Sequence, residues 1–135
     1  MKKIQSQSTS NPCSISQAAA EAALRGGLEE TQTMLKAFKE RHDYVVEMLN
    51  SITGVHCLPC DGTFYAFFNV QAVIDKLPNI QDDVAFSEYL LQEAGVALVP
   101  GTAFGAPGYL RLSYATSQTN LENALTRFKE VVERG

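Results

Sequence analysis

One arginine lies in the middle of an apolar, strand-like run near the C-terminal end of the chain. Arg111 stands between Leu110 and Leu112 in the sequence YLRLSY. Because side chains alternate along a strand, the two leucines and Tyr114 are expected on one face of a sheet and Arg111 on the other. On pattern alone, a solvated arginine on the wet face is the simpler interpretation. The alternative is a binding site for a carboxylate, which the rigid guanidinium matches at two points.

The order of helical and strand-like patterns predicts an α+β fold, a small α/β sandwich. Helices are expected over residues 14–26, 28–50, 82–94 and 117–135, and strands over residues 55–58, 64–70, 96–99 and 109–115. This order fits about four helices covering a short antiparallel or mixed sheet of three or four strands. The polar residues 1–13 are expected to form an N-terminal loop, and residues 14–135 a single domain.

Local signals refine these elements. Ser14 and Gln17 have the S-x-x-Q spacing of a capping box, and Asp82 or Asp83 is expected to cap the third helix. Thr116 or Ser117 is expected to cap the last one. A buried stripe is predicted for the long second helix, formed by Met34, Leu35, Phe38, Val45 and Leu49. The run 64–70 is apolar at nearly every position, which is typical of an interior strand.

Composition excludes several classes of protein. Hydrophobic residues make up 45% of the chain and charged residues 19%, as in a globular domain rather than a disordered tail. The net charge is −4 and no basic cluster is present beyond Lys2 and Lys3, so no nucleic-acid partner is expected. No apolar run could span a bilayer, and the first residues lack a signal sequence. No membrane partner is therefore expected, and the expected location is cytoplasmic.

The three cysteines, Cys13, Cys57 and Cys60, are expected to be reduced thiols. Cys57 and Cys60 have the spacing of a redox or metal-binding pair. A redox pair usually draws on a following helix N-terminus, and here a strand-like run follows instead. Zinc would need four ligands, and only distant residues could complete the set. Two small apolar residues near a turn are the favoured interpretation, and a thiol oxidoreductase stays an alternative.

Two motifs carry a resemblance to a known family. The loop PGTAFG, residues 100–105, followed by YLRLSYATS, residues 109–117, resembles the C-terminal part of aspartate-type aminotransferases. These are fold-type I, class I/II enzymes that use pyridoxal 5'-phosphate. The resemblance extends from QSQSTSNP near the start to the last helix. It implies the small domain of an enzyme that moves an amino group from an amino acid, aspartate or a similar one, to a 2-oxo acid.

The resemblance also implies roles for individual residues. Arg111 would bind the α-carboxylate of the amino acid substrate, and Phe104 would line the pocket. Phe64, within a G-[AT]-F-Y element, would help to wall the active site, although core packing explains it as well, and the next residue, Tyr65, is expected in the core. Ser8 and Asn11 would approach the phosphate of the cofactor in a neighbouring subunit.

The lysine to which the family attaches its cofactor is expected upstream of Met1. None of the six lysines of the chain is placed for that role, and no catalytic residue or metal ligand is assigned. The chain is therefore expected to bind no cofactor and to be inactive alone. It would meet its substrates through a missing large domain, in an enzyme that is a homodimer. The alternative is a stand-alone interaction or dimerisation module without catalysis.

Overall fold

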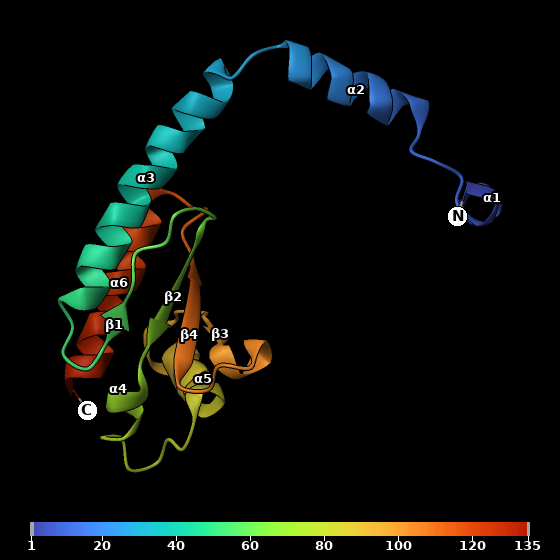
Figure 1. Ribbon diagram of the computed structural model, residues 1–135. Helices are drawn as coiled ribbons and strands as arrows, with labels where there is room; N and C mark the ends of the chain where they lie inside the picture. The colour runs from blue at the N-terminus through green and yellow to red at the C-terminus, as the bar shows by residue number, and fades with distance from the viewer. Residues whose placement is uncertain (1, 135) are drawn as a thin grey trace. The chain divides into compact units, whose positions relative to one another are not determined.

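The computed structural model describes residues 2–134, except for the side chain of Glu30, and divides the chain into two compact units. The N-terminal unit ends at Met34, and the C-terminal unit begins at Leu35. The N-terminal unit contains helices α1 (Lys2–Ser8) and α2 (Ser14–Arg25) (Figure 1). Helix α3 (Glu29–Asn50) begins in this unit and continues into the next. The prediction of one domain over residues 14–135 stays a prediction.

Two expectations for the N-terminal unit are wrong. Residues 1–13 were expected to be a loop, but Lys2–Ser8 form α1, in which the Ser8 hydroxyl donates to the Ile4 carbonyl over 2.8 Å. The predicted capping box is absent, because Ser14 lies inside α2 and makes no capping hydrogen bond. The Gln17 amide instead donates to the Pro12 carbonyl over 2.9 Å. The seven-residue α1 has no buried side chain, so no hydrophobic period marked it in the sequence.

The C-terminal unit contains one four-stranded sheet in which every neighbouring pair is antiparallel. Its strands, in the order β1-β2-β4-β3, are β1 (His56–Cys57), β2 (Tyr65–Asn69), β4 (Tyr109–Ser113) and β3 (Val99–Pro100). The predicted α+β class is confirmed. Strand β3 is shorter than the expected 96–99 run, because only its last residue and Pro100 pair with β4.

Helices α5 (Asp83–Ala94) and α6 (Gln118–Arg134) lie near their predicted positions. Asp82 caps α5 by accepting a hydrogen bond from the Ala85 amide over 2.8 Å, and Ser117 caps α6 by accepting from the Asn120 amide over 3.2 Å. Two further elements were not predicted, α4 (Gln71–Ile74) and the 3₁₀ turn η1 (Gly101–Phe104). Each has four residues, which is too short for a hydrophobic period to be visible.

The core lies between one face of the sheet and helices α3, α5 and α6. The sheet supplies Ala66, Phe68, Leu110 and Leu112. The helices supply Val45, Leu49, Phe86, Leu90, Leu121, Leu125 and Phe128. Phe128 makes edge-to-face contacts with Phe68 and Phe86, with ring centroids 5.9 and 6.5 Å apart. The alternation of YLRLSY therefore points its leucines into the core, as predicted.

Two predicted apolar features are buried only in part. Strand β2 is an interior strand of the sheet, as expected, with β1 on one side and β4 on the other, but Phe67 on its open face is 38% exposed. The stripe of α3 is buried at Val45 and Leu49, whereas Met34 and Leu35 are exposed. An apolar pattern predicts a surface that is buried by a neighbouring element. Within residues 2–134, Met34, Leu35 and Phe67 stay exposed.

The two adjacent phenylalanines of β2 test this one-sided core. Phe68→Ala should lower the free energy of unfolding by about 3–5 kcal/mol, because it removes a fully buried ring from the core. Phe67→Ala, on the open face, should cost less than about 1.5 kcal/mol, the usual value of an aromatic pair. Urea denaturation monitored by circular dichroism measures both. Equal losses from the two variants would contradict the assignment of the two faces.

Candidate functional site

Arg111 lies at the centre of the open face of the sheet. Strand β4 has β2 on one side and β3 on the other, and Arg111 is in register with Phe67 of β2 and Val99 of β3. Since neighbouring positions in register on one face have nearby side chains, the guanidinium rises from a surface built by three strands. A side chain in this place is held by sheet geometry rather than by a mobile loop.

The guanidinium lies over two aromatic rings. Its Cζ atom is 4.4 Å from the ring centroid of Tyr65 and 4.6 Å from that of Phe104. Tyr65 is two residues from Phe67 on β2, so the arginine side chain leans diagonally across the strand pair. Phe104 comes from η1, the turn that follows β3. Each ring attracts the cation by about 0.5–2 kcal/mol, depending on exposure to water, and the two contacts fix its position.

Arg111 has no acidic partner among residues 2–134. No carboxylate of this described range lies within ion-pair distance of it, and no acceptor there receives a hydrogen bond from its guanidinium. A guanidinium carries five N–H donors in one plane. Aromatic contacts hold the group in place but satisfy none of those donors. The half-buried cation is therefore available to a ligand that carries a planar, two-oxygen anion.

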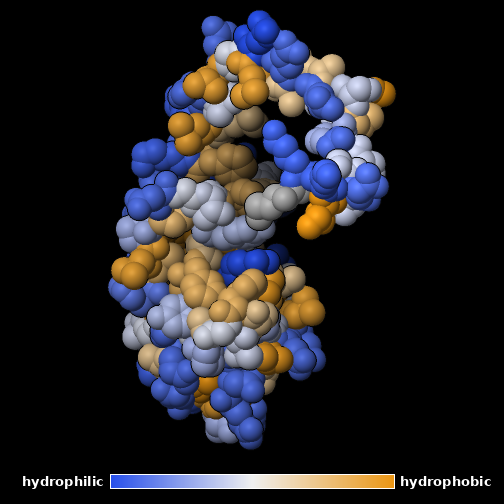
Figure 2. All heavy atoms as spheres, turned by 45° about the vertical axis from the view of Figure 1, so that its right-hand side comes forward, coloured by the Kyte–Doolittle hydropathy of each residue, from blue (hydrophilic) through white to orange (hydrophobic). Residues whose placement is uncertain are grey.

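The cation borders a shallow pocket of about 360 Å³. It is lined by Leu58, Cys60, Thr63, Tyr65, Phe67, Phe104 and Arg111. The walls are mainly apolar, and the arginine is the one charged group among them. Figure 2 shows hydrophobic side chains gathered around hydrophilic groups on the part of the molecule that bears the sheet. A pocket with one oriented cation and apolar walls suits a small organic acid.

The structure brings together some of the predicted site residues and not others. Phe104 contacts Arg111 and lines the same pocket, and its role towards a substrate stays a prediction. Phe64 does not line this pocket, since its ring packs on Tyr65 at 4.4 Å between centroids and faces Phe38 at 6.3 Å. Ser8 and Asn11 belong to the N-terminal unit, where both are exposed. Their roles near a cofactor stay predictions.

The expectation that Tyr65 lies in the core is wrong. Its ring lies under the guanidinium of Arg111 on the open face, with Phe67 beside it. The signal was present in the alternation of β2, which separates Tyr65 and Phe67 from the buried Ala66 and Phe68. The alternation did not show which face is open, because both faces of this strand are apolar. The sequence of either strand alone also does not give the register of β2 against β4.

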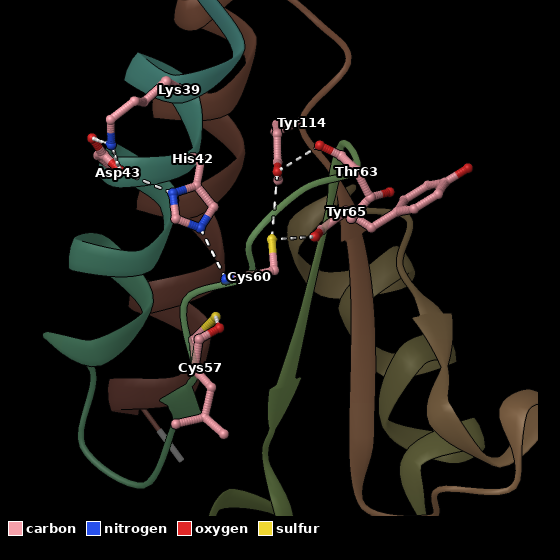
Figure 3. Close-up of polar contacts among 9 residues, drawn as sticks. Lys39, His42, Asp43, Cys57, Cys60, Thr63, Tyr65 and Tyr114 are labelled. Atoms are coloured by element: carbon pink, nitrogen blue, oxygen red, sulfur yellow. Dashed lines mark hydrogen bonds and ion pairs between the residues drawn. The ribbon is translucent and has the colours of Figure 1, made fainter. Parts of the chain in front are cut away.

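One wall of the pocket is a loop, residues 58–63. It is held by His42 of α3 and by Tyr114, which directly follows β4 (Figure 3). His42 accepts a hydrogen bond at Nε2 from the Cys60 amide over 3.2 Å, and its Nδ1 lies 2.9 Å from Asp43 Oδ1. A ring nitrogen that accepts must be unprotonated, so this pairing fixes the neutral Nδ1–H tautomer. The hydrogen bond from His42, followed by that from Lys39, lowers the pKa of the Asp43 carboxyl.

Thr63, at the end of this loop, has the left-handed backbone angle φ of 71°. Such an angle costs a threonine roughly 1–2 kcal/mol. The Tyr114 hydroxyl donates to the Thr63 carbonyl over 3.0 Å and is itself buried beneath the loop. Burial, and then the hydrogen bond with Cys60, raises the pKa of Tyr114, so that hydroxyl stays neutral. A neutral donor compensates the strained turn and keeps the wall in place.

Cys57, at the end of β1, and Cys60, in the loop, are free thiols that face different partners. Cys60 Sγ lies 3.6 Å from the Tyr65 carbonyl and 3.7 Å from the Tyr114 hydroxyl, while Cys57 Sγ lies 3.6 Å from the Leu58 carbonyl. Burial raises the pKa of Cys57 to about 11, with a further contribution from Cys60. Such a thiol is a poor nucleophile at neutral pH. Within the described range, no three His, Cys, Asp or Glu side chains are placed to hold a metal ion.

Comparison with known proteins identifies the family of the chain. Residues 1–128 match the family described as aminotransferase class I and II. The chain belongs to this family. It is 50% identical to the aspartate/prephenate aminotransferase of Nitrosomonas europaea over 98% of its own length, and 43% identical to an aspartate aminotransferase of Rhizobium meliloti over 99%. The crystal structure of the aspartate aminotransferase from Rhizobium meliloti matches 97% of the chain with a TM-score of 0.88 at 41% identity.

The chain spans about a third of these relatives: 34% of each of the two curated proteins and 34% of the solved structure. An aspartate aminotransferase from Thermotoga maritima has a TM-score of 0.81 at 43% identity, again over 97% of the chain and 32% of the larger structure. The resemblance to the aminotransferase small domain is confirmed. None of the helices described here has the length and apolar character needed to cross a membrane.

The thiols provide a test of the loop geometry. At pH 8, iodoacetamide should modify the exposed Cys13 fastest and Cys57 slowest, because the Cys57 thiol is buried and its pKa is raised. The Cys57 rate should climb only as the pH approaches 11. Stability from the neutral thiol should be complete below pH 9.0, the ordinary value, and lost as the pH rises towards 11. Peptide mass spectrometry gives the three rates, and modification of Cys57 as fast as Cys13 at pH 8 would contradict the buried site.

Proposed function

We propose that this chain supplies the substrate-carboxylate site of a pyridoxal-phosphate-dependent aminotransferase. That enzyme would move an amino group from an amino acid, aspartate or a similar one, to a 2-oxo acid. The observation that carries the proposal is the guanidinium of Arg111, which lies over Tyr65 and Phe104 and has no acidic partner among the described residues. The relatives of this chain are named aspartate and aspartate/prephenate aminotransferases. Aspartate and prephenate are both carboxylic acids.

Arg111 would bind the α-carboxylate through two parallel N–H···O bonds. The ring faces of Tyr65 and Phe104 would keep the guanidinium plane oriented, so that its donors are already aimed when the substrate arrives. The apolar wall formed by Leu58 and Phe67 would exclude water from the ion pair. Such an ion pair is worth more than an exposed one, which typically gives less than about 1 kcal/mol.

Family membership implies pyridoxal phosphate in a full-length enzyme, where the cofactor acts as the electron sink of the reaction. The described lysines do not fit an attachment point for it. Lys36, Lys39 and Lys76 are exposed, and Lys129 forms an ion pair with Glu133 at 3.7 Å. Lys2 and Lys3 are exposed as well. This chain would therefore contribute the carboxylate site, and the rest of the enzyme would contribute the cofactor site.

Association with another polypeptide is the second part of the proposal. Exposed apolar side chains along α1, α2 and the start of α3 favour a covering surface. They are Ile4, Ile15, Leu24, Leu28, Met34 and Leu35. The intact enzyme would be a cytoplasmic homodimer, and Ser8 and Asn11 would lie near the cofactor of the neighbouring subunit. A stand-alone dimerisation module would use the same apolar residues without catalysis.

A chimeric enzyme tests the role of Arg111. In it, this chain replaces the matching third of the Rhizobium meliloti aspartate aminotransferase. Arg111→Lys should lower kcat/KM for aspartate by about 10- to 100-fold, because charged hydrogen bonds worth about 1.5–3 kcal/mol lose their two-point geometry. Arg127→Lys is the control, since Arg127 is exposed on α6 and donates to the Asn123 carbonyl of its own helix. An unchanged kcat/KM for Arg111→Lys would remove the proposed role.

A second test concerns the cofactor. Pyridoxal phosphate titrated into this chain alone should show no stoichiometric change of its absorption band at neutral pH, because no described lysine is buried. The intact Rhizobium meliloti enzyme serves as the positive control. A saturable band at one equivalent per chain would show that a lysine of this chain does hold the cofactor.

A further inference from the structure

The structure contains a buried carboxylate that the proposed function does not use. Asp83 is fully buried at the start of α5, next to the capping residue Asp82. Within residues 2–134 it forms no ion pair. Burying a charge without a counter-ion is costly unless hydrogen bonds compensate it. What those hydrogen bonds hold in place indicates the role of Asp83.

All the side-chain hydrogen bonds of Asp83 come from the loop that carries Phe104. Oδ2 accepts from the Thr102 amide over 2.7 Å, and Oδ1 accepts from the Thr102 hydroxyl over 2.7 Å and from the Gly108 amide over 3.3 Å. Burial by itself raises the pKa of Asp83, but these bonds lower it by more, and the net pKa lies below the ordinary value. The group is therefore an ionised acceptor at neutral pH.

These contacts join the two ends of the loop 101–108. Thr102 is the second residue of η1 and Gly108 directly precedes β4, so one carboxylate holds the start and the end of the loop together. Both ends require glycine: a Cβ on Gly101 would collide with the Ala106 carbonyl, and Gly108 has the left-handed φ of 78°. Phe104 lies between the tied ends. Its ring meets Arg111 at 4.6 Å and the ring of Phe67 edge-on at 6.2 Å.

We infer that Asp83 is a positioning residue for the carboxylate site. By fixing Thr102 and Gly108 it holds Phe104 against Arg111, and so it sets the direction of the guanidinium without touching the substrate. The inference rests on the proposed function of Arg111, but its geometric part does not depend on that function. One loop links Asp83 to the guanidinium: its ends are hydrogen-bonded to Asp83, and its Phe104 ring contacts Arg111.

Asp83→Asn is the decisive variant, with Asp82→Asn as its control. In either orientation of the new amide, its NH₂ group faces a backbone donor, the Thr102 amide or the Gly108 amide, so at least one bond must break. Asp82→Asn removes the same charge one residue earlier, at an exposed position, and asparagine caps helices as well as aspartate. Thr102→Val removes only the hydroxyl bond, and Thr102→Ser retains it.

The first readout is the side-chain Nε–Hε NMR signal of Arg111 in this chain, identified by its loss in Arg111→Lys. Aromatic rings displace this signal from that of an exposed arginine. We expect Asp83→Asn to move it towards the exposed value and Thr102→Val to move it part of the way. Asp82→Asn and Thr102→Ser should leave it in place. A signal that stays fixed in both Asp83→Asn and Thr102→Val would overturn the inference, and the threonine pair decides if Asp83→Asn does not fold.

The second readout is binding of acetate, a minimal carboxylate, followed through the same Arg111 signal. Asp83→Asn should weaken acetate binding at least about threefold relative to Asp82→Asn, through misalignment of a two-point contact. A displaced signal with unchanged acetate affinity would overturn the functional part of the inference. Acetate that binds neither the unmodified chain nor its variants would overturn the proposed carboxylate site, while the Arg111 signal alone would still decide whether Asp83 positions the loop.

Discussion

The proposed carboxylate site depends on one cation, which two aromatic rings hold while its hydrogen-bond donors have no partner among residues 2–134. Arg111 lies over Tyr65 and Phe104 on the open face of the sheet, whereas the leucines on either side of it are buried in the core. Within the C-terminal unit, the helices α3, α5 and α6 pack on one face of the sheet and leave the face that carries Arg111 open. Strand β4 is therefore anchored in the core by one face and presents Arg111 on the other. The same strand therefore stabilises the fold and presents the charge.

Two loops flank that cation, and buried or half-buried polar side chains hold each of them. The loop 58–63 is held by His42 and Tyr114, and the loop 101–108 by Asp83. The His42 imidazole and the Asp83 carboxylate accept hydrogen bonds from backbone amides, and the Tyr114 hydroxyl donates one to a backbone carbonyl. Because buried polar groups are costly when unpaired, these contacts favour one loop conformation over others. The walls of the pocket are thus set by hydrogen bonds, and its floor by the sheet.

Periodicity in the sequence predicted the elements that pack through repeated patterns. The alternation of YLRLSY placed Arg111 opposite its leucine neighbours. The family resemblance, rather than periodicity, suggested Phe104 at the same pocket. Tyr65 was misplaced because β2 is apolar on both faces, and only its register against β4 shows which face is open. The role of Asp83 was hidden for a related reason: its partners lie 19 and 25 residues away, and capping signals are local. A local sequence pattern shows neither which distant residues pair nor which face of a strand stays exposed.

The most direct test of the carboxylate site is a crystal structure of the chimeric aspartate aminotransferase with a bound unreactive dicarboxylate such as maleate. The account predicts one carboxylate in two-point contact with the Arg111 guanidinium, at about 2.7–2.9 Å for each N–H···O bond, with Tyr65 and Phe104 still against the cation. A dicarboxylate bound elsewhere, with Arg111 paired to an acidic side chain from the rest of the enzyme, would contradict it.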